Sequence, residues 1–171
     1  MARRTIFLLG ALCGGLAAQT KQSGIGVCNP KPETQQIVDV GDRAGHVVGV
    51  AKVSCTWTTP MEMAGLKSTG YTIAVLTDAS GKGPLNSQDR GYVVMTMENG
   101  DKAFARFQGK GTVSLTGGEP GAGEGTWSYT GGTGKLKGLI GKGTYKSATN
   151  KDHVEEDHIE GEWSIAESKK K

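Results

Sequence analysis

Short apolar or alternating runs, separated by turn residues, fill the chain from His46 onward. No stretch of about twelve residues there shows the three- and four-residue apolar spacing of an amphipathic helix. The pattern therefore predicts an all-β protein of seven or eight strands. The expected strands are residues 46–58, 70–78, 90–98, 102–115, 123–130, 141–148 and 155–166, with 35–40 as a candidate first strand.

Turn-forming residues lie between these runs. The connections 78–84, 99–101 and 117–121 are rich in Gly, Asp, Asn and Pro, which adopt positive φ or preset a turn. Asn99-Gly100 is the strongest hairpin signal among them.

The numbering parity of the later strands indicates which face is buried. Odd positions are apolar or glycine, whereas even positions carry Arg, Lys, Gln, Ser, Thr and Glu. We therefore take the odd face as the interior. Closing such a sheet removes its edges, and about eight strands enclose a space that side chains fill or a small ligand occupies. We expect an antiparallel, closed barrel of about eight strands.

A short motif recurs along this barrel. Residues 109–113, 123–127 and 141–145 all read Gly, a charged residue, Gly, Thr and a large apolar residue. Glycine on an inner face lets a strand bend or gives room to an aromatic ring. We interpret these glycines as barrel corners, with a glycine-lined ligand channel as the alternative. No Gly-Lys pair is followed by Ser or Thr, which excludes a Walker A phosphate loop.

Strands 70–78 and 90–98 differ because both of their faces are apolar. The outward face of such strands needs cover, either from the N-terminal segment or from another subunit. We therefore expect a homo-oligomer.

The chain divides into four parts. Residues 1–18 place Arg3 and Arg4 before an apolar run and small residues, which is the layout of a secretory signal peptide. The apolar run is shorter than the roughly 20 residues of a membrane-spanning helix, so no membrane insertion is expected. Residues 19–45 form an N-terminal segment, 46–166 the barrel and 167–171 a basic tail. The expected location is secreted or periplasmic.

The charge of the chain bears on its binding partners, and its cysteine content bears on a possible disulfide. Without Arg3 and Arg4, the 20 basic residues become 18 against 17 acidic ones, and the two signs are interspersed. Nucleic-acid binding needs a basic stripe, so no nucleic-acid partner is expected. Only Cys28 and Cys55 remain after the leader, and in an oxidising compartment they would form a disulfide. Two buried free thiols are the alternative.

Residues 131–141 read Gly-Gly-Thr-Gly-Lys-Leu-Lys-Gly-Leu-Ile-Gly. This segment resembles the signature of the dirigent and allene oxide cyclase barrel superfamily, with Leu136 where that family usually has an aromatic residue. The stretch from Tyr92 to Trp163 is also similar to small exported bacterial members without an assigned activity. The resemblance implies an eight-stranded antiparallel barrel, often trimeric, with an apolar cavity. It carries no catalytic residue onto this chain.

The candidate ligand-binding residues are aromatic, and their alternative role is ordinary core filling. They are Phe107, Trp127, Tyr129, Tyr145 and Trp163. Arg90 and Arg106 are candidates for pairing with a carboxylate at the cavity mouth, where either would orient an anionic ligand head. Structural ion pairing is the alternative for both arginines. No cofactor is expected.

Catalytic and metal-binding signals are sparse. Residues 152–160 contain two histidines and five carboxylates. His153 and His158 have opposite parity and would face opposite sides of a strand, so we expect a solvated charged hairpin and no metal site. His46 has no recognisable catalytic companion, and no Gly-x-Ser-x-Gly motif occurs.

Two functions follow from these observations. The first is a non-catalytic exported barrel that binds a small apolar or amphipathic molecule. The alternative is a cyclase- or isomerase-like enzyme, which predicts an ionisable residue pointing into the cavity.

Overall fold

The structure is a computed structural model that describes residues 19–114, 121–150, 152 and 154–166. The expected signal peptide (1–18), the basic tail (167–171) and His153 lie outside these residues, as does most of the turn at 117–121. Within the described part of the chain, no helix has the length and apolar character needed to cross a bilayer.

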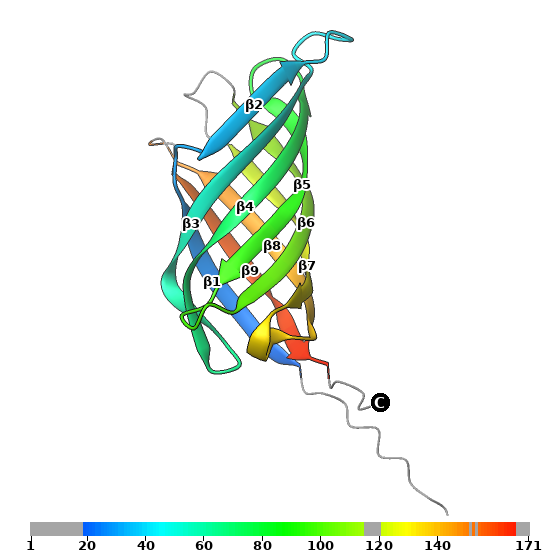
Figure 1. Cartoon of the computed structure of the whole chain (residues 1–171). Helices are drawn as coiled ribbons and strands as arrows, with labels where there is room; N and C mark the ends of the chain where they lie inside the picture. The colour runs from blue at the N-terminus through cyan, green and yellow to red at the C-terminus, as the bar shows by residue number, and fades with distance from the viewer. Residues whose placement is uncertain (1–18, 115–120, 151, 153, 167–171) are drawn as a thin grey trace, which may run out of the picture.

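Nine antiparallel strands form one sheet that closes on itself (Figure 1). The strand order is β1-β9-β8-β7-β6-β5-β4-β3-β2, and an additional β1–β3 pairing closes an eight-stranded barrel with β2 outside it. This confirms the expected all-β, antiparallel closed barrel. The elements are β1 (Thr20–Cys28), β2 (Thr34–Asp39), β3 (Val47–Met63), β4 (Leu66–Ser80), β5 (Leu85–Thr96), β6 (Lys102–Val113), β7 (Ala122–Gly132), η1 (Gly134–Leu136), β8 (Leu139–Thr149) and β9 (Glu155–Ile165).

The barrel begins earlier than the residue 46 expected from the alternation, because β1 is one of its strands. β1 pairs with β9 over its whole length. Its register aligns Gln22 with the inward Gly161, so its inner positions are Gln22, Gly24, Gly26 and Cys28. The bulkier Ile25 and Val27 therefore point outward. The sequence of β1 does not alternate between apolar inner and polar outer residues. Its place in the barrel is therefore recognised only from its pairing with β9 and β3.

Barrel closure depends on a short contact that we call the closing seam. It consists of three residue pairs between β1 and β3: Gly26–Trp57, Val27–Thr56 and Cys28–Cys55. The last pair is joined by the Cys28–Cys55 disulfide, which confirms the predicted pairing. Beyond Cys28 the chain leaves the wall, and β2 occupies the edge of β3 from Val47 to Lys52.

Inward glycines give room to aromatic rings from neighbouring strands. The Trp127 ring covers Gly143 and Gly161, where an added Cβ would lie about 2.5 Å or less from the ring. The Tyr145 ring covers Gly125 and Gly109 in the same way. At these four glycines the inner face gives room to an aromatic ring, which is one of the two roles considered for inner glycines in the sequence. The repeated motif thus lays a ring flat across the wall, which leaves the centre of the barrel free.

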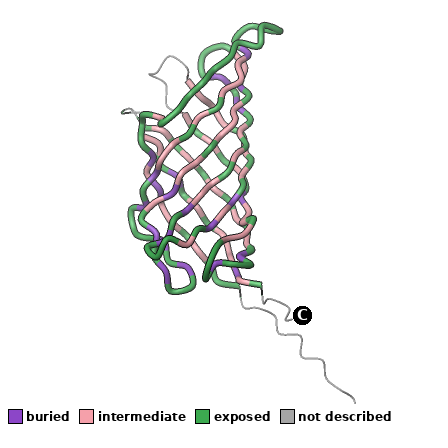
Figure 2. The backbone as a smooth tube through the Cα atoms, in the orientation of Figure 1, coloured by how far each residue is buried: buried purple, intermediate pink, exposed green. Residues whose placement is uncertain are grey.

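Apolar side chains fill one end of the barrel. Many of the buried backbone positions lie toward this end in Figure 2. The β3–β4 hairpin extends beyond the strands expected at 46–58 and 70–78, and it brings Met61, Met63 and Leu66 to this end. Leu136 of η1 and Leu139 of β8 close it from the other side, and Leu136 is 0% exposed. The glycine signature at 131–141 therefore builds the plug of the barrel, and the leucine at its aromatic position fits that packing.

The expected Asn99-Gly100 hairpin is present between β5 and β6. The Met97 N–H donates to the Asp101 carbonyl and the Gly100 N–H to the Met97 carbonyl, at 2.8 and 2.9 Å. Gly100 has φ of 87°, which only glycine adopts without strain.

Removing the disulfide tests how far the closing seam depends on it. A Cys28→Ala/Cys55→Ala double variant is expected to lose about 3.5 kcal/mol of unfolding free energy, because the closed loop no longer restricts the unfolded chain. Urea titration monitored by tryptophan fluorescence measures this loss. A loss below about 1 kcal/mol would show that the seam holds without the covalent link.

Substitution of one inner glycine tests the ring-over-glycine packing. Gly143→Ala is expected to destabilise the protein by about 1–3 kcal/mol, since its Cβ overlaps both the Glu160 carbonyl oxygen and the Trp127 ring. Gly49→Ala in β3 is the matched control, because a Cβ there lies 3.4 Å or more from its neighbours. Equal melting temperatures for the two variants would contradict this account.

Candidate functional site: a cavity inside the barrel

The barrel encloses a cavity of about 360 Å³. It extends from the methionine-rich plug toward the end where β6, β7 and β8 meet their turns, and Thr112, Ala122 and Thr149 lie along it there. The walls are mainly apolar and aromatic, as in sites for small molecules. Val53, Ile73, Val93 and Ile159 supply aliphatic surface.

Four of the five aromatic residues singled out in the sequence lie on this cavity: Phe107, Trp127, Tyr129 and Tyr145. Trp163 does not line it and packs against the core cluster. Phe107 meets Tyr145 edge to face, with ring centroids 5.8 Å apart, and Trp127 meets Tyr129 at 5.0 Å. Their shared odd numbering predicted that these rings lie on one face, and the pairing of the strands decides which rings contact each other.

Trp57 and Tyr71 also line the cavity and were not identified from the sequence. Their ring centroids are 4.4 Å apart. The Trp57 Nε1–H is buried without a hydrogen-bond partner among the described residues. By contrast, the Trp127 Nε1–H donates to the Thr144 carbonyl at 3.1 Å. The Trp57 donor is therefore unused, but it is buried in the wall and not open to the cavity.

Three carboxylates line the cavity: Asp89 of β5 and Glu155 and Asp157 of β9. No Lys, Arg or His stands among the described residues that line it. The interior therefore combines aromatic walls with acidic groups that have no cationic neighbour on the cavity wall.

Asp157 lies deepest in the wall and is 7% exposed. The Tyr71 hydroxyl donates to its Oδ2 at 2.8 Å, and it reaches there over Gly26, where any Cβ would overlap it. Cys28 Sγ lies 3.6 Å from the same oxygen, as a van der Waals contact because a disulfide sulfur carries no proton. Burial raises the pKa of Asp157, and the hydrogen bond from Tyr71 opposes this in part.

Asp89 is held by two hydroxyl groups. Thr77 Oγ1 donates to its Oδ1 at 2.6 Å and Ser87 Oγ donates to its Oδ2 at 2.8 Å. Both donors are neutral, so they orient the carboxylate without cancelling its charge.

Glu155 stands two residues before Asp157 on the same face of β9. Burial, reinforced by the negative charges of Asp157 and then Asp89, raises its pKa to about 7, although the Ser147 hydroxyl opposes the rise. Burial and the charge of Asp89 also raise the pKa of Tyr145 to about 12. The cavity thus contains a carboxyl group that exchanges its proton near neutral pH.

These acidic positions correct the expectation of a solvated charged hairpin at 152–160. Glu156, His158 and Glu160 are exposed, and His158 Nε2 lies 2.6 Å from Glu156 Oε1. Glu155 and Asp157 instead face inward. The available signal was parity: both have odd numbers on a strand whose other odd positions are Ile159, Gly161 and Trp163. Their number and charge suggested solvent, but the strand places them on the cavity.

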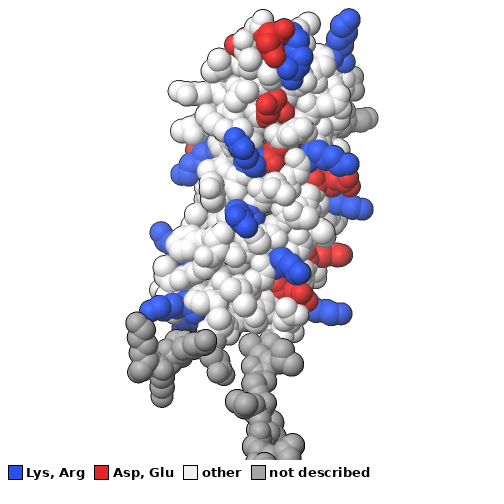
Figure 3. Space-filling view, turned by 90° about the vertical axis from the view of Figure 1, so that its right-hand side faces the viewer, with Lys and Arg blue, Asp and Glu red and all other residues white. Residues whose placement is uncertain are grey.

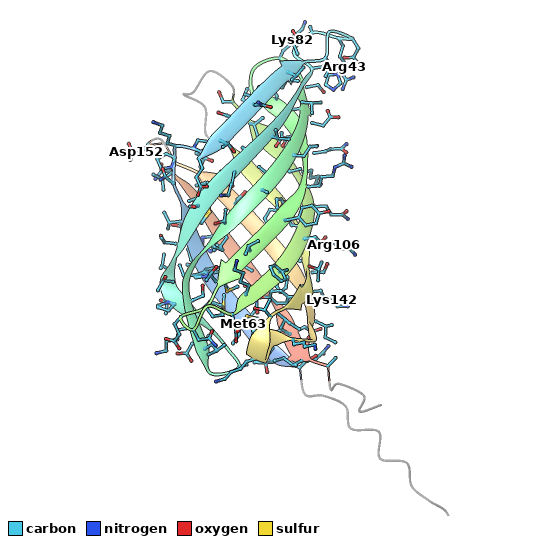
Figure 4. The ribbon with its side chains drawn as sticks, in the orientation of Figure 1. Arg43, Met63, Lys82, Arg106, Lys142 and Asp152 are labelled. Atoms are coloured by element: carbon cyan, nitrogen blue, oxygen red, sulfur yellow. A yellow bond between two sulfur atoms is a disulfide. The ribbon has the colours of Figure 1, made fainter. Side chains whose placement is uncertain are left out.

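Both candidate arginines are exposed on the outer wall, which excludes their expected role at a ligand head. Arg106 projects away from the barrel (Figure 4), and its Nε donates to Ser128 Oγ at 3.2 Å. Even positions face outward on β5 and β6, and Arg90 and Arg106 both follow this rule. No ion pair involving either is present in the described part of the chain.

His46 has carboxylate companions that the sequence did not reveal, but they lie outside the cavity. Its Nδ1 contacts Asp42 and its Nε2 lies 3.1 Å from Asp78 Oδ1. The hydrogen bond to Asp42 is the main reason that its pKa is raised. The arrangement ties the β2–β3 connection to β4.

No protein-family description matches the chain, and no curated protein matches its sequence. Among solved structures, the fold is similar to that of a pterocarpan synthase dirigent protein. The match has a TM-score of 0.48 and 10% identity, and it covers 94% of this chain and 98% of the other. The barrel assignment itself rests on the strand pairings.

The raised pKa of Glu155 predicts a pH-dependent stability. The folded state holds this proton up to about pH 7, whereas an unfolded glutamate, with its ordinary pKa of 4.5, releases it at lower pH. The folded state is therefore penalised increasingly as pH rises between these values. Glu155→Gln, which mimics the protonated form, is expected to stabilise the protein at pH 8 by at most about 3 kcal/mol, with little effect at pH 4.

Denaturant unfolding at both pH values measures this effect. Glu160→Gln is the control, because Glu160 is an exposed carboxylate on the same strand. A stabilisation that is equal at pH 4 and pH 8, or equal in both variants, would show that the burial of Glu155 is not its cause.

Proposed function

We propose that this protein is a ligand-binding barrel that holds a small amphipathic molecule in its interior. The observation that carries the proposal is the cavity of about 360 Å³, which is closed at one end and lined by aromatic rings and a few polar groups. Ligand sites in proteins commonly combine these features. The ring-over-glycine packing supports it, since it keeps bulky residues against the wall.

The lining suggests how a ligand would lie. Trp127, Phe107 and Tyr129 offer flat apolar surface in the middle of the cavity. Glu155 and Ser147 stand closer to the β8–β9 turn and offer polar contacts. The apolar part of the ligand would pack on the rings, and its polar part would contact the carboxylates. A ligand that fits this lining is therefore amphipathic.

We further propose that the protein is exported and assembles as a homo-oligomer. The leader-like layout of residues 1–18 and the Cys28–Cys55 disulfide support export. An outward apolar band supports assembly. Its side chains form cross-strand pairs from β3 to β6, namely Val50–Leu76, Ala74–Tyr92 and Val94–Phe104. Tyr92 is 67% exposed, and charged groups are scattered around uncharged surface in Figure 3.

Native mass spectrometry of the protein purified without denaturation tests both proposals. The expected result is an integral multiple of the chain mass plus an excess that organic extraction removes. Phe107→Trp, which adds bulk inside the cavity, should reduce the bound excess by about tenfold or more while the multiple stays the same. A bare monomer, with no excess under any gentle condition, would contradict both proposals.

One observation favours a second function, that of a cyclase- or isomerase-like enzyme. That function needs an ionisable residue inside the cavity, and Glu155, with a pKa of about 7, meets the need. A positioned acid of this kind would give or take a proton from a bound substrate. Chromatography of the extracted ligand separates the two functions. An enzyme lacking its acid, as in Glu155→Gln, would carry a different isomer of equal mass, whereas a binding protein would carry the same compound as the wild type.

A further inference from the structure

We infer that the cavity selects a ligand with a protonated amine, attracted by the carboxylates of Asp89, Glu155 and Asp157 and packed against the surrounding aromatic rings. The inference rests on the proposed ligand-binding function and adds the chemical class of the ligand. No Lys, Arg or His lines the cavity within the described part of the chain, so the protein itself supplies no countercharge there.

The charge balance of the cavity wall is the first argument. The hydrogen-bond donors to Asp89 and Asp157 are the hydroxyl groups of Thr77, Ser87 and Tyr71, which are all neutral. Buried carboxylates without a cationic partner are unfavourable, and the interior retains that unfavourable charge. A cationic ligand would relieve it, whereas an anionic ligand would add to it.

The placement of the acids is the second argument. Asp89 stands on β5, and Glu155 and Asp157 stand on β9, so the acids approach the cavity from different parts of the wall. The hydroxyl contacts fix the orientation of Asp89 through both of its oxygens. An ammonium group only donates hydrogen bonds, so it complements a wall whose charged groups are all acceptors: it would contact one of these acids directly while the others add their negative charge.

The aromatic lining is an independent observation that points to the same ligand. The electron-rich faces of Trp and Tyr attract cations, and rings around an acidic group form a common site for ammonium ligands. Trp57, Tyr71, Trp127 and Tyr145 all line this cavity.

Three probes of nearly equal shape test the inference: 2-(1-naphthyl)ethylamine, 2-(1-naphthyl)ethanol and 3-(1-naphthyl)propanoate. Isothermal titration at pH 8 measures their binding to the full chain after organic extraction. The amine is expected to bind at least about tenfold more tightly than the alcohol, because hydrogen bonds to charged groups are stronger than neutral ones. The propanoate is expected to bind more weakly than the alcohol.

Variants show whether the cavity acids cause the preference. Asp157→Asn and Glu155→Gln should each reduce the preference for the amine by several-fold and leave alcohol binding nearly unchanged. Glu160→Gln removes an equal charge from the exposed face of the same strand and should change nothing. The comparison of the three probes on the wild-type protein does not depend on any variant folding.

Each outcome decides the inference. A preference for the amine that falls in the two cavity variants and persists in Glu160→Gln supports it. Binding of the alcohol as tight as that of the amine, or tighter binding of the propanoate, overturns it and leaves the ligand-binding function standing. If none of the three probes binds and the purified protein also carries no extractable ligand, both the inference and the proposed function are wrong.

Discussion

Closure of the barrel through a very short contact is the constraint on which the rest of the structure depends. Only three residue pairs join β1 to β3, whereas the other neighbouring strands of the barrel pair over seven residues or more. The Cys28–Cys55 disulfide lies within this seam. Because a closed sheet has an inside only while it stays closed, the cavity and the burial of Asp157 both depend on these few contacts. The Cys28 sulfur of this disulfide also contacts Asp157, so the closing seam lies next to one of the cavity carboxylates.

The interior shows how an eight-stranded barrel with many aromatic residues keeps a hollow centre. Glycines repeat on the inner face, and each gives the ring of a neighbouring strand a place to lie flat, as Trp127 does on Gly143 and Gly161. The apolar side chains that would otherwise fill the space gather at one end, where Met63, Leu66 and Leu136 form a plug. Packing is therefore uneven along the barrel axis: it is dense at the plug and open toward the β8–β9 turn.

Against this apolar background the acidic groups are the unusual feature. A carboxylate placed inside costs free energy unless it is protonated, hydrogen-bonded or neutralised by a partner. The protein uses the first two means, through the raised pKa of Glu155 and the hydroxyl donors to Asp89 and Asp157. Outside, lysines and arginines such as Arg106 and Lys142 are exposed, and the wall itself separates them from the cavity. This division between an acidic inside and a mixed outside follows from strand parity.

The sequence by itself determined the fold class and the inner face of most strands, because strict alternation is a local signal. It indicated the disulfide but left free thiols open, and the pairing of β1 with β3 decided it. It also brought Phe107, Trp127, Tyr129 and Tyr145 to one face. It placed Trp163 on that face as well, but distance along the barrel decides whether an inward residue meets the cavity or the core.

Only the tertiary structure decided the role of β1, whose inner positions are Gln22, two glycines and Cys28 and which is recognisable only by its pairing with β9. It also decided that Glu155 and Asp157 lie inside. Composition places such acids in solvent, and their burial arises because a strand paired on both sides must send every second residue inward.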